Sequence, residues 1–277
     1  MDGTLNWNDF SGRAVLITGG TKGIGFATGI AFGRRGAQVT LTHKWKSADT
    51  QAVRSAFAEA GAPEPRIIDA DASDIVGVRT VLSAIRKTHD SLHTFVSNVA
   101  HAPVVRALDD YNRRDLARSI DYCAWPLVSH VQAIKEIFGS YPKYVLAMSS
   151  AGAESYLPNY DIMAAAKAAL ETLCRYMNLR LRVHGTRVNV LSTRFARTES
   201  MSEILGHDFE AFLDEYAPGL FAETSEVGEA AAGLCSGLMD AIGGQVITVD
   251  HGAGIFDNFS RLFQERDRLT PLPRRKP

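Results

Sequence analysis

Tyr160 and Lys167 are the two side chains whose types and spacing most directly suggest chemistry. They flank the start of an Ala- and Leu-rich segment, residues 163–181, that predicts a buried helix. Seven residues make almost two helical turns, so both side chains lie on one face. An ammonium beside a phenol lowers its pKa from about 10, and Tyr160 becomes a candidate proton donor or oxyanion-binding hydroxyl. A core ring and a solvated lysine would give the same spacing, so the pair needs independent support.

Ser149 and Ser150 precede this helix and follow an apolar segment, residues 144–148, that predicts a strand. In an open parallel sheet, ligands bind at the carboxyl ends of the strands. Ser150 is therefore a third candidate catalytic residue, able to position a carbonyl group.

A glycine-rich loop supplies the independent support. Residues 14–18 predict a short strand, and residues 24–35 predict a helix. Between them runs Thr-Gly-Gly-Thr-Lys-Gly-Ile-Gly, residues 18–25. Strand, glycine turn and helix in this order let a pyrophosphate approach the backbone at a helix N-terminus. The loop predicts dinucleotide binding, with these candidate residues: Gly19, Thr21, Lys22, Gly23, Ile24 and Gly25.

The Gly-x-x-x-Gly-x-Gly spacing, taken with the downstream Tyr and Lys, resembles the short-chain dehydrogenase/reductase superfamily from Gly12 to about Phe256. The pattern Tyr160-x-x-Met163-x-x-x-Lys167 is similar to that of divergent enoyl-acyl-carrier-protein reductases, whereas Ser150 stands where those enzymes usually carry a further tyrosine. The resemblance implies that Lys167 and Tyr160 also contact the cofactor. It assigns further cofactor contacts to Asp71 and Ala72 at the adenine, to Asn98, and to Thr198 at the nicotinamide or pyrophosphate.

The end of the second predicted strand, residues 38–42, bears on the choice of cofactor. NAD-binding folds place a carboxylate there, to hold the ribose 2′-hydroxyl. This chain carries His43 and Lys44 instead, with Lys46 close by and Lys22 in the glycine loop. Cations in this position favour a 2′-phosphate, so we favour NADPH over NADH. Ordinary surface lysines remain the alternative explanation.

Composition limits the broad class of the protein. The chain has 277 residues, a hydrophobic content of 45% and a formal net charge of −1, so no nucleic-acid partner is expected. Its three cysteines form no C-x-x-C pair, which fits a reduced, cytoplasmic setting. No apolar run is long enough for a membrane span, and no metal site is expected.

The predicted architecture is a single Rossmann-like, doubly wound α/β domain over residues 1–277, with about seven parallel strands and helices on both faces. Residues 193–223 predict a substrate lid whose apolar side chains line a pocket or form a small core of their own. Residues 257–277 form a C-terminal tail. The resemblance implies a homodimer or homotetramer, packed through residues 111–138 and 159–184.

The predicted function is NADPH-dependent reduction of an enoyl thioester of the fatty-acid or polyketide type, with the acyl group free or bound to a carrier protein. Tyr160 would stabilise the enolate oxygen and Lys167 would hold the ribose. Reduction of a polyketide or aromatic ketone is the alternative that Ser150 favours, and a non-catalytic NADP-binding protein is a third. Ser119, Asp121 and Arg194 stand at positions where the superfamily has other residues, and no role is assigned to them.

Overall fold

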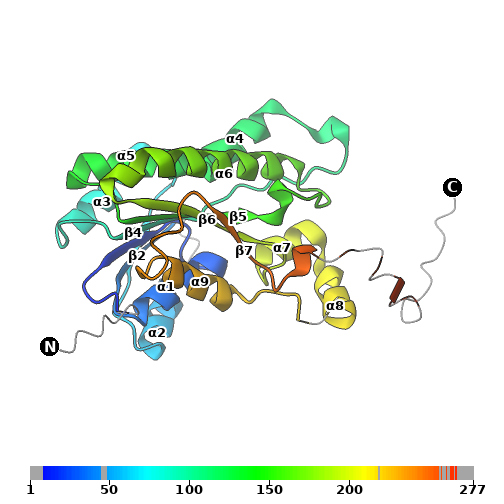
Figure 1. Cartoon of the computed structure of the whole chain (residues 1–277), viewed down its shortest axis with the longest axis horizontal. Helices are drawn as coiled ribbons and strands as arrows, with labels where there is room; N and C mark the ends of the chain where they lie inside the picture. Colours follow the sequence, from blue (N-terminus) through cyan, green and yellow to red (C-terminus); the bar gives the residue numbers. More distant parts are fainter. Residues whose placement is uncertain are drawn as a thin grey trace.

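In this computed structural model, a parallel sheet lies between two layers of helices (Figure 1). The structure describes residues 9–44, 49–217, 219–255, 257, 260, 263, 264 and 266. Within these residues the sheet has seven strands in the order β3-β2-β1-β4-β5-β6-β7. The strands are β1 (Ala14–Ile17), β2 (Gln38–His43), β3 (Arg66–Asp69), β4 (Thr94–Ser97), β5 (Tyr144–Ser150), β6 (Arg187–Thr193) and β7 (Val246–Val249). The predicted fold class is confirmed.

The helices cover both faces of the sheet. One layer comprises α3 (Ile75–Arg86), α4 (Arg113–Cys123), α5 (Trp125–Phe138) and α6 (Asp161–Leu181), and the other α1 (Gly23–Gly33), α2 (Thr50–Glu59) and α9 (Thr224–Leu234). Beyond β6, α7 (Glu199–Leu205) and α8 (His207–Tyr216) extend past the edge of the sheet (Figure 1). Because both faces are covered, β1 and β4 are buried along their whole lengths; β1 is entirely apolar, whereas β4 places Phe95 and Val96 between Thr94 and Ser97.

Several predicted boundaries shift in the structure. The segment 111–138, expected as one helix bent at Pro126, forms two helices, because Ala124 ends α4 and the proline lies in the first turn of α5, where its missing N–H costs nothing. The helix expected over 225–240 ends at Leu234. Strand β5 continues through both serines that were expected to follow it, so Ser149 and Ser150 pair in register with β6. None of the helices described is long and apolar enough to cross a membrane.

Candidate active site

The topological switch point of the sheet lies between β1 and β4, which are neighbours although the chain visits β2 and β3 between them. The Asn98 side chain bridges this point, with Nδ2 donating to the carbonyl oxygens of Thr18, at 3.1 Å, and Gly19, at 2.9 Å. A Cβ on Gly25 would lie 2.3 Å from the Gly19 oxygen and 2.6 Å from Asn98 Nδ2. Asn98 and Gly25 therefore hold the loop in shape, in addition to any contact with a cofactor.

The glycine loop fits the pyrophosphate of a dinucleotide. Gly19 and Gly23 have φ values of +61° and +55°, which only glycine adopts freely. No described side chain caps the start of α1, so its first-turn N–H groups are left for an anion. Thr198 comes close to this loop, because its Cγ2 lies 3.8 Å from the position of a Cβ on Gly23. The structure thus brings Gly19, Gly23, Asn98 and Thr198 to one edge.

The remaining loop residues have other neighbours. Lys22 forms an exposed ion pair with Glu199 of α7, with 3.0 Å between Nζ and Oε2. Ile24 packs on the hydrophobic core between the sheet and the α1 layer, and Thr21 lies in the turn. Lys22 therefore faces the lid rather than the end of β2.

Of the cations predicted to bind a 2′-phosphate, Lys22 and Lys44 form ion pairs with acidic residues instead. His43 is buried, and its Nδ1 has no hydrogen-bond partner among the described residues. Lys44 forms an ion pair with Asp71 and donates to the Tyr122 hydroxyl at 2.5 Å. Lys22 is engaged elsewhere, and Lys46 lies outside the described residues.

Asp71 is the centre of this group. The Tyr122 hydroxyl donates to its Oδ2 at 2.9 Å. Burial alone would raise the pKa of Asp71, but hydrogen bonds from Lys44, Ser73 and Tyr122 outweigh it and bring the pKa to about 2. The buried Ala72 follows Asp71. Tyr122, on α4, is a residue that the sequence did not reveal, since a tyrosine on an amphipathic helix carries no specific signal.

Tyr160 and Ser150 meet at the carboxyl end of β5. Tyr160 directly precedes α6, is 9% exposed and packs with Cys123, Met163 and other apolar residues. Ser150 ends β5, and its Oγ accepts a hydrogen bond from the Gly152 N–H at 3.2 Å. The Tyr160 ring lies directly against Gly152, since a Cβ there would be 2.4 Å from Tyr160 Cδ1.

The electrostatics of Tyr160 correct one expectation. Burial raises the pKa of Tyr160 to about 12, and a hydrogen bond with Ser150 opposes this only in part. The expected lowering by Lys167 is not found. The reason is geometric, because the Lys167 ammonium donates to the carbonyl oxygen of Met148 at 2.6 Å. Tyr160 is therefore a neutral hydroxyl at physiological pH.

Lys167 is buried in the second turn of α6, with 5% of its surface exposed. Burial lowers the pKa of Lys167, while the neighbouring Cys123 and Glu171 oppose this shift. The next turn of α6 places the Glu171 carboxylate where the Ser149 hydroxyl donates to it at 2.6 Å. The predicted pair thus belongs to a longer polar row along α6.

The predicted lid forms α7 and α8 with a small core of its own, made by Met201, Leu213, Ala217 and Phe221. Of the two expectations for its apolar residues, the structure shows a core for these four. Ile204 of α7 faces the other way and packs on the cluster that contains Tyr160. The lid residues therefore adjoin the candidate catalytic tyrosine.

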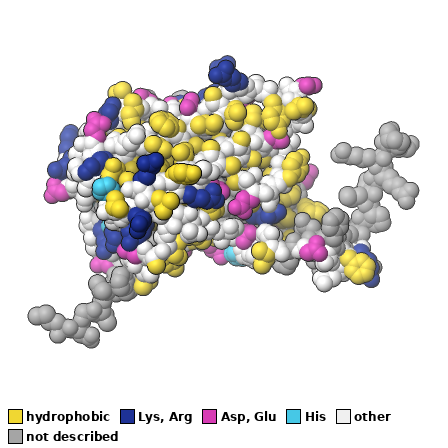
Figure 2. Space-filling view, turned by 45° about the horizontal axis from the view of Figure 1, so that its top comes forward, with side chains coloured by type: hydrophobic (Ala, Val, Ile, Leu, Met, Phe, Trp, Pro, Cys, Tyr) yellow, Lys and Arg dark blue, Asp and Glu magenta, His cyan; other side chains and the backbone are white. Residues whose placement is uncertain are grey.

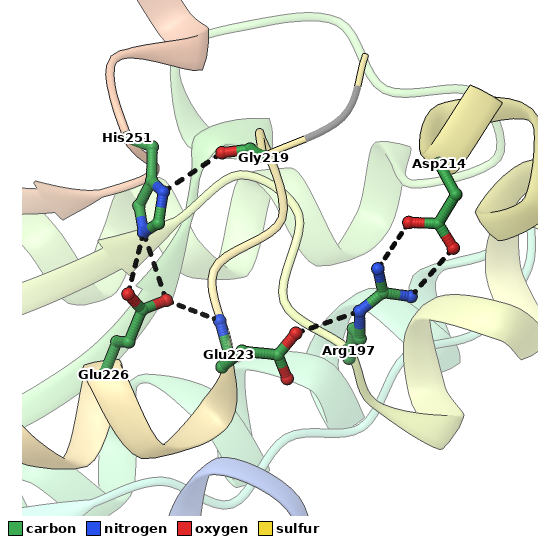
Figure 3. Close-up of polar contacts among 6 residues, drawn as sticks. All are labelled: Arg197, Asp214, Gly219, Glu223, Glu226 and His251. Carbon is green, nitrogen blue, oxygen red and sulfur yellow. Dashed lines mark hydrogen bonds and ion pairs between the residues drawn. The ribbon is translucent and has the colours of Figure 1, made fainter. Parts of the chain in front are cut away.

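One ion-pair cluster ties this segment to the body of the protein (Figure 3). Arg197 donates to Asp214 of α8 at 2.5 Å and to Glu223, just before α9, at 3.0 Å. The guanidinium also lies over the ring of Phe221, 4.1 Å from its centroid. Arg197 therefore joins the loop after β6 to α8 and to the residue that directly precedes α9.

A second cluster involves His251, which follows β7 with φ +52° (Figure 3). One ring nitrogen contacts the carbonyl oxygen of Gly219 at 3.0 Å, and the other contacts the Glu226 carboxylate at 3.0 Å. His251 therefore connects the turn after β7 to Gly219 near the end of the lid and to Glu226 of α9.

The three residues left without a role have simple contacts. Ser119 is buried and donates to the carbonyl oxygen of His101 at 2.9 Å, which fixes α4 against the loop after β4. Asp121 is exposed. Arg194 lies over the ring of Phe195, 5.8 Å from its centroid.

Comparison with known proteins gives the family. The family model described as "Enoyl-(Acyl carrier protein) reductase" matches residues 19–254. The chain belongs to this family. It is a short-chain dehydrogenase/reductase-type oxidoreductase, and members of this superfamily bind a nicotinamide cofactor.

Two curated relatives and one solved structure illustrate the family. The chain is 30% identical to the enoyl-[acyl-carrier-protein] reductase [NADH] FabI of Escherichia coli over 88% of its length and 95% of that protein. It is 26% identical to the 1-cyclohexenylcarbonyl-CoA reductase of Streptomyces collinus, covering 88% and 87% of the two chains. A short-chain dehydrogenase from Burkholderia cenocepacia in complex with NADP shares the fold, with a TM-score of 0.77, 24% identity and coverage of 88% and 99%.

Proposed function

We propose that this chain is a nicotinamide-dependent reductase of enoyl thioesters. The observation that carries the proposal is the buried Tyr160 hydroxyl beside Ser150, at the carboxyl end of β5 and therefore at the same edge of the parallel sheet as the dinucleotide loop after β1. The Tyr-x6-Lys spacing and the family match support the same reaction.

Each side chain has a separate task. The chemistry that a bound reduced nicotinamide supplies is hydride transfer to the β-carbon of the double bond. Negative charge then develops on the thioester oxygen, and Tyr160 donates a hydrogen bond to it. With its pKa raised to about 12, Tyr160 stays protonated at neutral pH and is available as a donor. Ser150 positions the carbonyl group, and Lys167 adds a buried positive charge and binds the cofactor ribose.

We propose NADPH as the preferred cofactor, although the FabI relatives are named as NADH enzymes. The chain itself carries His43 and Lys44 at the end of β2, where NAD-binding folds place a carboxylate for the ribose 2′-hydroxyl, and the neighbouring Asp71 carboxylate is already bonded to Lys44, Ser73 and Tyr122. For Lys44 to bind a 2′-phosphate, its contacts with Asp71 and Tyr122 must open. Lys44→Ala should therefore weaken NADPH binding at least tenfold more than NADH binding if the proposal is right, and should affect both alike if it is wrong.

The substrate we propose is an acyl chain carried as a thioester, on a carrier protein or on coenzyme A. The family description names the first carrier and the Streptomyces collinus relative the second. Ketone reduction is the second candidate, because the hydrogen bond between Ser150 and Tyr160 also suits a carbonyl oxygen. A protein that binds the cofactor without turnover would show neither reaction.

We also propose that the protein self-associates through the face formed by α4 and α6. Figure 2 shows apolar side chains over the helical layer that Figure 1 places uppermost. The apolar residues of α4, α6 and the turn after it that are more than one third exposed are Leu116, Ile120, Tyr176, Leu179 and Val183. Burial of such a face between two copies would remove it from water. Leu179→Glu should lower the oligomeric state in light scattering, whereas an unchanged mass would contradict this.

The test of function compares crotonyl and acetoacetyl thioesters by the loss of reduced-nicotinamide absorbance, with NADPH and with NADH. Consumption with the crotonyl substrate alone would support enoyl reduction, and consumption with the acetoacetyl substrate alone would favour the ketoreductase. Tyr160→Phe should reduce turnover by at least about 100-fold while the protein stays folded. Turnover near the wild-type value would refute the role of Tyr160.

A further inference from the structure

Two successive turns of α6 hold two successive residues at the end of β5. Lys167 Nζ donates to the carbonyl oxygen of Met148 at 2.6 Å, and Ser149 Oγ donates to Glu171 Oε1 at 2.6 Å. Both charged residues are nearly buried, with exposed fractions of 5% and 4%. The next residue along β5 is Ser150, so these contacts fix the strand end that carries a candidate catalytic hydroxyl.

The buried Lys167 ammonium needs a compensating charge. Its neighbours are Cys123 from α4, the Met148 carbonyl from β5, and Glu171 from its own helix. Residues four apart on a helix face one another, so the carboxylate of Glu171 lies on the same side as the ammonium. A buried charge without a partner is strongly unfavourable, and the carboxylate favours the protonated lysine.

Glu171 is held in turn by groups from several elements. Ser149 of β5 donates to one carboxylate oxygen, and Arg175 of α6 lies 3.8 Å from the other. Burial raises the pKa of Glu171 and the neighbouring Glu154 adds to this shift, whereas the hydrogen bond from Ser149 and the charges of Arg175 and Lys167 oppose it. Arg175 is half exposed, so its effect on Glu171 is weakened by solvent.

We propose that Glu171 is a positioning residue that keeps Lys167 protonated and holds Ser149, and through it the strand end that bears Ser150. The inference deepens the proposed function and rests on it, because Lys167 and Ser150 take their roles from that reaction. A merely structural Glu171 would supply only an acceptor for Ser149, which a glutamine supplies equally well.

The experiment separates charge from hydrogen bonding with two matched variants. Glu171→Gln keeps an acceptor for Ser149 but removes the charge, and Ser149→Ala keeps the charge but removes the hydrogen bond. Both are compared with the wild type in the pH dependence of kcat/KM for the thioester and in the Kd of the reduced cofactor. In Glu171→Gln we expect the fall of kcat/KM at high pH, the basic limb of the profile, to move to lower pH by about one unit, because Lys167 then loses its proton at lower pH. Ser149→Ala should lower kcat and leave the limb in place.

A basic limb at the wild-type position in Glu171→Gln would overturn the proposal, as would an equal shift in Ser149→Ala. If Glu171→Gln does not fold, Glu171→Asp serves instead, because it retains the charge and should leave the basic limb of the kcat/KM profile in place. A shift of that limb by about one pH unit in Glu171→Asp would contradict the proposal. The two levels of inference fail separately. The proposed function fails if the wild type reduces no enoyl thioester. In that case the pH dependence of the cofactor Kd, compared between the wild type and Glu171→Gln, still tests the link between Glu171 and Lys167.

Discussion

Gly152→Ala should disable the candidate active site while leaving the fold almost intact. The added Cβ would lie 2.4 Å from Tyr160 Cδ1 and 2.6 Å from Cε1, whereas ordinary contacts begin at 3.4 Å. The ring or the turn after β5 must therefore move by about 1 Å. Tyr160 also packs in a buried cluster with Cys123, Met163 and Ala166, so a shift of the ring would carry its hydroxyl away from its present position.

The magnitude follows from this geometry. A misplacement of about 1 Å at a catalytic group costs about 100-fold in rate, which corresponds to about 2.7 kcal/mol in activation free energy. The assay is kcat with the crotonyl thioester under saturating cofactor, together with the thermal midpoint. Gly233→Ala is the matched control, because its Cβ would meet nothing within 4 Å in α9, and the change should leave kcat unaltered and stabilise the protein by up to about 1 kcal/mol. A folded Gly152→Ala protein with wild-type kcat would refute the reasoning.

Three further changes test other parts of the structure. Gly25→Ala would place a Cβ 2.3 Å from the Gly19 oxygen, so it should distort the loop and weaken cofactor binding at least about tenfold by calorimetry; unchanged affinity would contradict the role of the loop. Burial lowers the pKa of His130 to about 4 from 6.5, so this residue reduces the free energy of unfolding as pH falls below 6.5, by about 2 kcal/mol at pH 5. In urea unfolding at pH 7 and pH 5, His130→Phe should remove this contribution to the loss, and an unchanged loss would contradict the prediction. Arg197→Met should raise KM at least threefold and speed proteolysis of the lid, while changing unfolding free energy by less than about 1 kcal/mol; an unaffected KM would show that this anchor does not serve substrate binding.

The sheet could be predicted because each strand contains apolar residues within a short segment, and helical segments separate the strands. The signal is clearest in β1, which is fully buried and entirely apolar. Boundaries were less certain where polar residues continue a strand. Ser149 and Ser150 extend β5 because they pair with Ser192 and Thr193 of β6, a contact that local sequence cannot reveal.

The residues of the site were predictable by type and spacing, but their partners were not. The position of Lys167 relative to Tyr160 suggested that the lysine would lower the pKa of the phenol. In the structure, the Lys167 ammonium instead donates a hydrogen bond to the carbonyl oxygen of Met148. Lys44 was identified as a cation without the knowledge that Tyr122, 78 residues away in sequence, would contact it. Such tertiary contacts decide the pKa of a group, because burial and hydrogen bonding act through the fold.

The state of Tyr160 bears on which reduction this site suits. A ketone reductase must deliver a proton to the oxygen that becomes a hydroxyl, and a phenol of lowered pKa serves this best. An enoyl reductase only has to stabilise the enolate oxygen, because the proton that completes the saturated thioester is taken from solvent by the α-carbon and not by the oxygen. Burial leaves Tyr160 with a pKa of about 12, so it holds its proton firmly while it donates a hydrogen bond. The raised pKa of Tyr160 therefore agrees with our proposal of double-bond reduction, in which the tyrosine keeps its proton.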